Sequence, residues 1–220
     1  MKSSLLALSL LPAFSGLAFA DVSLQFASYG SANLTFEGTG DKIIFSPDSN
    51  GYDFQISQAS IAGLDGLFGK IDGTFIIGTP LVTGSLQTAP VVGMGTLSIY
   101  DGNGSFLTAN VWWKDALTVG AVGALNPDDV TNVANISYTG SNAALQALAA
   151  NATGSDVVSF QFTPPESLNQ LTTDGAVNTA TYSGSITAVP EPTSYALAIG
   201  ASSLLGALVI RRKSRALPAV

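Results

Sequence analysis

Apolar and polar residues alternate with a period of two in several short stretches of the chain. Successive side chains of a β-strand point to opposite faces, so this period is typical of strands buried on one side. Clusters of Gly, Asn and Asp separate the stretches, as tight turns require. The stretches that predict strands are residues 22–26, 33–37, 52–56, 96–100, 135–138, 158–162 and 181–186.

Short strands at this spacing predict an all-β fold, either an antiparallel β-sandwich or a jelly-roll-like body. One segment departs from the pattern, because residues 141–151 are rich in Ala and Leu. Leu145 and Leu148 are three residues apart, and Ser141 or Asn142 is suited to an N-cap. We expect a short helix there, lying over one sheet or bridging two strands.

The charges are distributed unevenly along the chain. Charged residues make up 10% of it, against about 25% in ordinary soluble domains. Residues 21–189 contain 14 of the 15 acids but only three bases, Lys42, Lys70 and Lys114, which gives a net charge of −11. Such a charge favours solubility and opposes binding to nucleic acid or anionic lipid. We therefore expect no nucleic-acid partner.

Two residue types are absent, since the chain contains no Cys and no His. Without Cys there is no disulfide scaffold, thiolate cluster or cysteine nucleophile. Without His there is no Ser-His-Asp triad and no histidine metal ligand. The sequence predicts no cofactor and no metal site.

The N-terminal segment has the three parts of an export signal. Lys2 provides a positive charge, residues 5–11 are apolar, and Ala18 and Ala20 form a small-x-small cleavage pattern. Pro12 and Gly16 make an uncleaved anchor helix the weaker alternative. We expect a signal peptide over residues 1–20, export through the Sec route, and Asp21 as the new N-terminus.

The C-terminal segment has the features of a single transmembrane helix. Residues 195–210 carry no charge, and a helix of this length spans about 24 Å, slightly less than a hydrocarbon core of about 30 Å. A basic cluster follows, which the positive-inside rule places on the cytoplasmic side. The cluster consists of Arg211, Arg212, Lys213 and Arg215.

A Pro-Glu-Pro tripeptide precedes this span. Pro190 and Pro192 hold the backbone extended and present Glu191 as an isolated acid. The tripeptide, the short apolar span and the basic end together resemble the PEP-CTERM sorting signal of Gram-negative bacteria. The resemblance covers about the last thirty residues. The chain departs from the pattern in its additional tail, residues 216–220.

The resemblance implies that exosortase, a membrane-embedded protease or transpeptidase, recognises Pro190, Glu191 and Pro192. It also implies that the basic cluster acts as a cytoplasmic stop. The precursor would be anchored in the inner membrane with its body on the periplasmic side, and would then reach the cell surface. The domains expected are a signal peptide (1–20), an acidic body (21–188) and a sorting signal (189–220), with its motif at 189–192.

Acidic residues at two places are candidates for chemistry. Asp101-Gly102-Asn103-Gly104-Ser105 resembles the start of a calcium loop, but Phe106 and Trp112 stand where an EF-hand needs Gly and Glu. A hairpin turn between residues 99 and 107 is the preferred interpretation.

Asp128 and Asp129 are adjacent acids in a predicted loop. No spacing identifies the pair of carboxylates that a glycoside hydrolase needs.

Trp112 and Trp113 form the one local concentration of large aromatic residues, and an aromatic platform can stack on a sugar ring. Neighbours on a strand face opposite ways, so one core Trp and one partly covered surface Trp is the preferred interpretation. Four N-x-[ST] patterns also occur and are taken as unmodified, at Asn33, Asn103, Asn135 and Asn151.

These observations favour a non-enzymatic exported protein of the cell surface or extracellular matrix, with exosortase and the inner membrane as its partners. One alternative is a glycan-binding module of an exopolysaccharide or biofilm matrix, with Trp112 or Trp113 as the stacking residue. A second alternative is a glycoside hydrolase or lyase that uses carboxylates.

Overall fold

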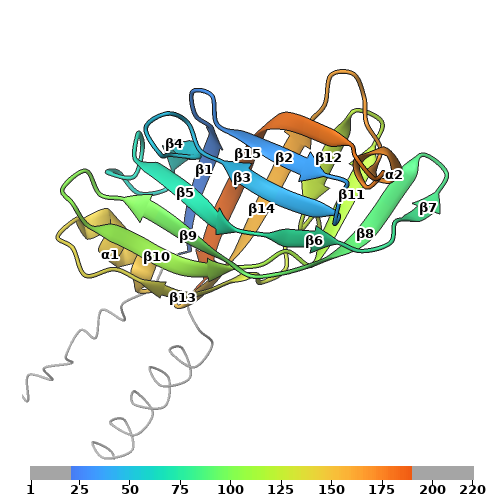
Figure 1. Ribbon diagram of the computed structural model, residues 1–220. Helices are drawn as coiled ribbons and strands as arrows, with labels where there is room; N and C mark the ends of the chain where they lie inside the picture. The colour runs from blue at the N-terminus through green and yellow to red at the C-terminus, as the bar shows by residue number, and fades with distance from the viewer. Residues whose placement is uncertain (1–20, 190–220) are drawn as a thin grey trace, which may run out of the picture. The chain divides into compact units, whose positions relative to one another are not determined.

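The computed structural model describes residues 21–189, which form an all-β body with two short helices (Figure 1). The predicted signal peptide, the sorting motif, the apolar span and the basic cluster lie outside these residues. Within residues 21–189, neither helix has the length and apolarity needed to cross a membrane.

Fifteen strands and two helices make up the body. The first strands are β1 (Val22–Ser28), β2 (Asn33–Glu37), β3 (Lys42–Ser46), β4 (Phe54–Ala59), β5 (Phe68–Gly73), β6 (Phe75–Ile77), β7 (Leu81–Thr83) and β8 (Leu86–Val92). The remaining strands are β9 (Gly95–Tyr100), β10 (Phe106–Val111), β11 (Asp115–Val119), β12 (Val122–Leu125), β13 (Val133–Ser137), β14 (Thr153–Gln161) and β15 (Val177–Val189). The helices are α1 (Ala143–Ala149) and α2 (Leu168–Leu171).

The strands form one antiparallel sheet that closes on itself. β15 pairs with β14 along one edge and with β1 and then β2 along the other. Other strands also follow one another end to end, so that two short strands together line the edge of a neighbour. The strands arranged in this way are β3 and β4, β5 and β6, β8 and β9, β10 and β11, and β12 and β13. Two short strands that lie end to end therefore act as one long interrupted strand. Each long strand pairs with the long strands that precede and follow it in the sequence. The pairing of Val22 with Ala188 joins the first strand to the last.

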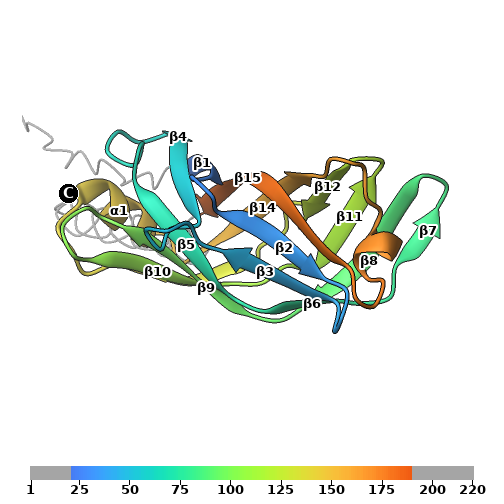
Figure 2. The same ribbon diagram turned by 45° about the horizontal axis from the view of Figure 1, so that its top comes forward.

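The closed sheet is flattened into two layers that face each other, which gives a sandwich-like body (Figures 1 and 2). The up-and-down order of its strands differs from the Greek-key order that a jelly-roll requires. Closure leaves the strands of the ring paired on both edges, and β7 lies outside the ring as a short hairpin partner of β8.

The strands predicted from alternation are confirmed at all seven places. β2 matches its predicted range, and β15 extends its predicted strand to Val189, the residue directly before Pro190. The predicted helix is confirmed as α1, and Asn142 is its N-cap, with its side chain accepting hydrogen bonds from the backbone of Ala144 and Leu145. The hairpin turn is also confirmed, because Ile99 pairs with Leu107.

Aromatic side chains fill much of the space between the layers. Trp113 stacks on Phe45 with ring centroids 5.3 Å apart and meets the edge of Phe75 at 4.4 Å. Phe45 also contacts Tyr182 at 5.1 Å. All four rings are buried. Burial of side chains of this size contributes roughly 1.5–3 kcal/mol each, which helps to explain how the body dispenses with disulfides.

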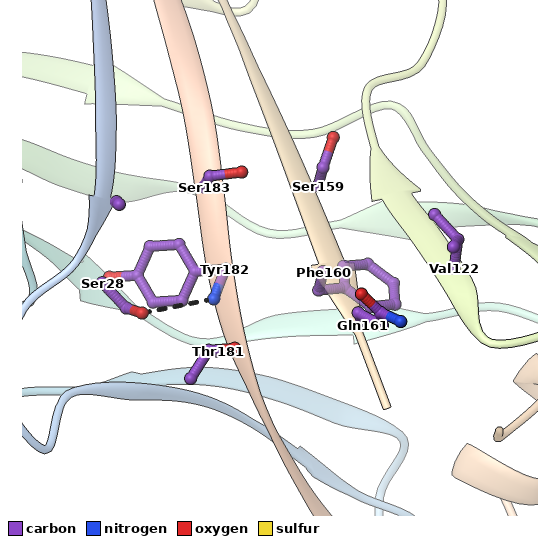
Figure 3. Close-up of a pocket in the computed structure, with 9 residues that line it drawn as sticks. Ser28, Val122, Ser159, Phe160, Gln161, Thr181, Tyr182 and Ser183 are labelled. Atoms are coloured by element: carbon purple, nitrogen blue, oxygen red, sulfur yellow. Dashed lines mark hydrogen bonds between the residues drawn. The ribbon is translucent and has the colours of Figure 1, made fainter. Parts of the chain in front are cut away.

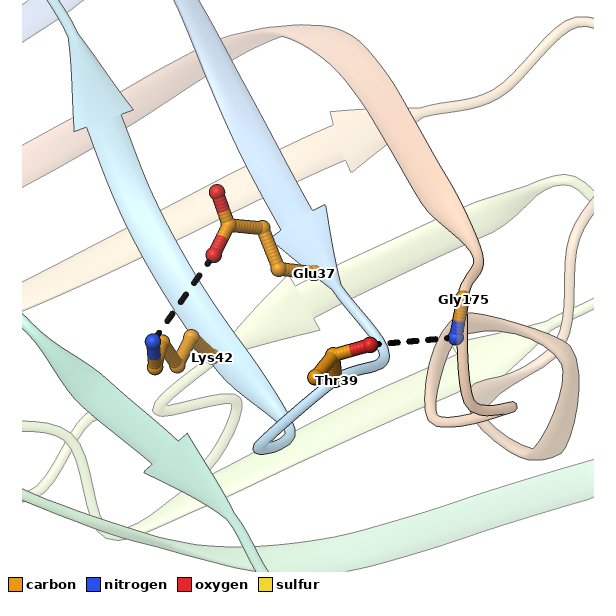
Figure 4. Close-up of polar contacts among 4 residues, drawn as sticks. All are labelled: Glu37, Thr39, Lys42 and Gly175. Atoms are coloured by element: carbon orange, nitrogen blue, oxygen red, sulfur yellow. Dashed lines mark hydrogen bonds and ion pairs between the residues drawn. The ribbon is translucent and has the colours of Figure 1, made fainter.

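The two helices lie at opposite ends of the closed sheet, α1 beside β10 and α2 beside β8 and β11 (Figures 1 and 2). Near α2, the turn between β2 and β3 meets the turn before β15 (Figure 4). The backbone N–H of Gly175 donates to Thr39 Oγ1 at 3.2 Å, and Gly38 donates to the backbone oxygen of Ala176 at 2.8 Å. A Cβ at Gly38 would overlap the backbone oxygen of Thr173, so only glycine fits this approach.

The interruption between β12 and β13 is bridged by a buried side chain. Asn132 Oδ1 accepts from the backbone N–H of Asp156 at 2.6 Å, and its Nδ2 donates to the backbone oxygen of Asp156 at 2.9 Å. The amide thus pairs with β14 as a strand residue would. Asn126 Nδ2 donates to the same oxygen at 3.3 Å.

We expect Asn132→Ala to destabilise the body by roughly 2–4 kcal/mol, because it leaves the buried N–H of Asp156 without a partner and weakens the bonding of its carbonyl oxygen. Chemical denaturation of the full chain in detergent measures the change. Asn169→Ala, which truncates an exposed amide on α2, is the matched control and should change stability by less than about 0.5 kcal/mol. Equal effects of the two substitutions would contradict the structural role of Asn132.

Candidate functional site

The two ends of the body lie side by side. Val22 pairs with Ala188, and Val189 pairs with Thr153 on the other edge of β15. One residue, Asp21, separates the predicted signal peptide from β1, and no residue separates β15 from Pro190. The two predicted targeting segments therefore join the body at neighbouring points, and residues 21–189 complete the closed sheet by themselves.

The two tryptophans have different environments. Trp113 is 1% exposed and stacks within the core, so it cannot reach a sugar ring, and its candidacy as a stacking residue is wrong. Trp112 is partly exposed in the connection between β10 and β11. The preferred interpretation, one core and one partly covered tryptophan, describes this arrangement.

A different set of aromatic residues gathers on the outer surface, and we call it the aromatic cluster. Tyr52 stacks on Phe68 (5.0 Å between centroids, 23° between planes) and on Tyr100 (6.2 Å, 21°). Tyr29 meets Phe68 at 4.7 Å, and Phe106 meets Tyr100 at 5.1 Å. None of the five is buried, and Phe106 is 45% exposed.

Strand register, together with the loops next to β1 and β4, explains why these five rings meet. Phe106 pairs directly with Tyr100, and Phe68 pairs with Gln55 on β4, three residues after Tyr52. The adjacent residues Gly69, Ile99 and Leu107 point into the core, so alternation turns Phe68, Tyr100 and Phe106 outward, whereas Tyr29 and Tyr52 lie in the loops after β1 and before β4. The members are spread over 78 positions of sequence, from 29 to 106.

Two loops of the same design support the cluster. In the first, Asp48 Oδ1 accepts from the backbone N–H of Asn50 at 2.9 Å and of Tyr52 at 3.0 Å. In the second, Asp101 Oδ1 accepts from Asn103 at 2.7 Å and from Ser105 at 3.0 Å. Each carboxylate therefore fixes the loop that carries or adjoins a ring of the cluster.

These two carboxylates are held in the ionised form. The hydrogen bond from the Tyr138 hydroxyl, 2.7 Å from Oδ2, is the main reason that the pKa of Asp101 lies below its usual value. The backbone N–H of Tyr52 is the main cause that lowers the pKa of Asp48. Burial, followed by the bond to Asp101, raises the pKa of the Tyr138 hydroxyl. The edge of the cluster is thus acidic at neutral pH.

A groove of about 370 Å³ runs over the outer face of β14 and β15 (Figure 3). Its lining is rich in hydroxyl and amide groups from Ser28, Ser159, Gln161, Thr181 and Ser183. The groove carries no charged side chain, so it offers no acid for hydrolysis.

Neither the adjacent acids Asp128 and Asp129 nor the two buried acids of the body lie in the groove. Asp128 and Asp129 lie exposed in the loop after β12. The carboxyl groups of Asp53 and Asp156 have strongly raised pKa values, but both side chains are buried in the core. Desolvation is the first cause that raises the pKa of Asp53 to about 6 and that of Asp156 to about 8. None of these four acids lines the hydroxyl-rich groove.

The two buried acids, Asp53 and Asp156, lie near Tyr182 in the core. The Tyr182 hydroxyl donates to the backbone oxygen of Asp53 at 2.9 Å, and its pKa is raised by burial and then by the charges of Asp53 and Asp156. Asp53 Oδ2 accepts from the backbone N–H of Ile71 at 2.5 Å. Neither carboxylate oxygen of Asp156 has a hydrogen-bond partner among residues 21–189.

The four N-x-[ST] asparagines occupy different places. Asn33 begins β2, Asn103 lies exposed in the β9–β10 turn, and Asn135 is exposed on β13. Asn151 is 2% exposed, and its side chain donates to the backbone oxygen of Ala147 at 3.2 Å. Within residues 21–189, no group of three or more acids is placed to hold a metal ion.

Comparisons of the chain with protein-family models, with curated proteins and with solved structures give no match.

The buried carboxyl of Asp156 predicts a pH-dependent stability. Its pKa is about 8 in the folded body and about 3.9 in an unfolded chain, so the folded state holds a proton that the unfolded state has lost. The stability that this bound proton contributes is fully present below about pH 4 and is lost as the pH rises through about 8. Asp53 acts in the same direction, with its pKa of about 6.

We expect the melting temperature of the full chain in detergent to fall between pH 5 and pH 9, and Asp156→Asn to reduce this fall. At pH 9 the variant should be more stable by roughly 1–3 kcal/mol because its amide carries no charge, and each kcal/mol corresponds to about 2–4 °C. Asp174→Asn, at an exposed acid, is the control and should follow the unsubstituted chain. A melting temperature that rises over this range would refute the assignment.

Proposed function

We propose that this chain is the precursor of an exported, non-enzymatic protein of the cell surface or extracellular matrix. In this proposal the Sec route exports it, the C-terminal span anchors it in the inner membrane, and exosortase sorts and processes it at Pro190-Glu191-Pro192. The body, residues 21–189, would then be the part that reaches the cell surface.

The observation that carries the proposal is where the two ends of the folded body lie. β1 begins at Val22, one residue after the predicted signal cleavage, and β15 ends at Val189, next to the predicted motif. Because Val22 and Ala188 are partners, both segments can be removed without taking a strand from the closed sheet. The body would therefore keep its fold through both processing steps.

The composition of the body also supports the proposal. Its sheet closes without cysteine, which suits an exported protein whose stability does not depend on disulfide formation. The two carboxyl groups with strongly raised pKa values, those of Asp53 and Asp156, are buried in the core, where a substrate cannot reach them. The geometry thus favours a binding or structural role over the carboxylate hydrolase or lyase considered from the sequence.

The sorting step is tested by producing the chain in a host with exosortase and in the same host lacking it. We expect the exported form to lose its C-terminal segment only when exosortase is present, as measured by intact mass. Replacing all three motif residues by Ala should leave the tail in place in both hosts. Should the unsubstituted chain keep its complete tail in both, the sorting proposal fails.

A matched control for this experiment lies within the body. Glu166 follows Pro165 in the exposed connection between β14 and α2, so it is a second Pro-Glu pair without the following Pro. Glu166→Ala should be processed like the unsubstituted chain, which separates loss of the motif from general effects of removing an acid.

The export step predicts a mature N-terminus at Asp21. We expect N-terminal sequencing of the exported chain to begin there, and substitution of Ala18 and Ala20 by Lys to preserve residues 1–20, because signal peptidase requires small side chains at these positions. Ala13→Ser, which changes a small residue away from the cleavage point, is the control. Recovery of the unsubstituted chain with Met1 still attached would contradict cleavage.

A further inference from the structure

We infer that the aromatic cluster, formed by Tyr29, Tyr52, Phe68, Tyr100 and Phe106, binds the sugar rings of an uncharged polysaccharide. The inference concerns the body alone and does not depend on how the precursor is sorted. It assigns glycan binding to a surface that differs from the two tryptophans singled out by the sequence.

The chemistry of the rings fits a carbohydrate. One face of a pyranose ring presents C–H groups, which pack on an aromatic face, while its hydroxyl groups lie around the edge. Tyr52 stacks with both Phe68 and Tyr100, and all three rings are partly exposed. Together with Phe106, which is 45% exposed, they form one continuous aromatic patch at the surface. Tyrosine adds a polar group to this apolar surface.

The tyrosine hydroxyl groups of the cluster are available for such contacts. Tyr138 and Tyr182 use their hydroxyls in hydrogen bonds within the body. No such bond is found for Tyr29, Tyr52 or Tyr100 among the described residues. These three groups can therefore exchange hydrogen bonds with sugar hydroxyls.

The cluster is not needed to fill the interior. The core between the layers already contains Phe26, Phe54, Phe45, Phe75 and Trp113, all buried. Three of the surface rings are turned outward by the pleat of β5, β9 and β10, and Tyr29 and Tyr52 join them from loops. Large aromatic side chains gathered on an exposed face are a common mark of a binding surface.

The backbone holds the cluster in place before a ligand arrives. Asp48 fixes the loop that ends in Tyr52, and Asp101 fixes the turn between Tyr100 and Phe106. Tyr138 links Asp101 to α1, because the Tyr138 hydroxyl also accepts from the backbone N–H of Asn142 at 3.0 Å. A surface that is already ordered loses less conformational entropy on binding.

Charge determines the class of polysaccharide. The body has a net charge of −11, and ionised Asp48 and Asp101 adjoin the cluster. Lys70, on the same strand as Phe68, is paired with Asp72 at 2.5 Å. An anionic polymer would be repelled here, whereas a cationic polymer would adhere to acidic surface generally. An uncharged polysaccharide is neither repelled nor bound by acidic surface generally, so stacking on the aromatic cluster would determine where it binds.

The test is affinity electrophoresis of the full chain in a detergent without sugar groups. The gels contain one neutral polysaccharide each, namely hydroxyethyl cellulose, dextran, xylan or galactomannan, and a further gel contains the anionic polymer alginate. We expect at least one neutral polymer to retard the chain and alginate to have no effect. Tyr52→Ala and Phe106→Ala should each weaken the retardation about tenfold, or ~1.4 kcal/mol.

Two variants serve as controls because they truncate accessible apolar residues elsewhere. Trp112→Ala removes a partly exposed ring that makes none of the contacts of the cluster, and Leu81→Ala removes a side chain that is 68% exposed on β7. Both should change retardation by less than about twofold. Thermal melting of every variant shows that the fold is kept, and Tyr52→Phe provides a conservative replacement that should preserve most of the binding.

The outcomes separate the proposal from its competitors. Absence of retardation by all four neutral polymers would overturn it, as would retardation that survives both cluster variants. Loss of binding in Trp112→Ala alone would return the site to the tryptophan. If light scattering instead shows a dimer that the cluster variants dissociate, with no neutral polymer bound, the surface is an interface between copies of this chain.

Discussion

The body depends on one strand, β15, which is hydrogen-bonded along both of its edges. β14 pairs with nine of its residues on one side, and β1 and β2 follow one another on the other side. The closed sheet has no covalent cross-link, so backbone pairing and burial must hold its ends together. Because the last strand completes the ring, the edges of β14 and β1 stay open until the chain is present up to Val189. Closure therefore explains how a cysteine-free body avoids exposed strand edges at the two places where the proposed processing would occur.

Much of this fold could be predicted from the sequence, because one side of the sheet faces a core. Alternation identified the strands at Val22, Asn33 and Thr181, and the Ala/Leu-rich segment identified α1. Other strands were missed for a physical reason. Ile43 and Ile44 are adjacent apolar residues in β3, and in β5 Gly69 takes an inward position where alternation expects a large side chain. The connectivity was not predictable either, since sandwich and closed meander share the same local pattern and differ only in which strands pair.

The candidate site was less accessible to sequence reasoning. Trp112 and Trp113 are adjacent in the sequence, but neighbouring side chains of an extended chain point to opposite faces, so the two rings do not form a common surface. The aromatic cluster arises from the opposite situation, in which residues far apart are brought together by register. Its local signal is the repeated Asp-x-Asn-Gly loop, which precedes Tyr52 and follows Tyr100. That signal indicated turns correctly, but only the order of the strands shows that both turns lie beside the same surface.

Charge connects the surface chemistry to the proposed fate of the protein. Removal of both targeting segments would remove Lys2 and the whole basic cluster, leaving three bases against 14 acids in residues 21–189. Such a body gains nothing from electrostatic attraction to an anionic cell surface, and salt would screen only part of its repulsion. If the body is exported as proposed, its retention outside the cell would have to come from contacts that do not rely on opposite charge. Aromatic stacking and hydroxyl hydrogen bonds are contacts of that kind, and the outer face of the closed sheet provides both, in the cluster and in the uncharged groove over β14 and β15.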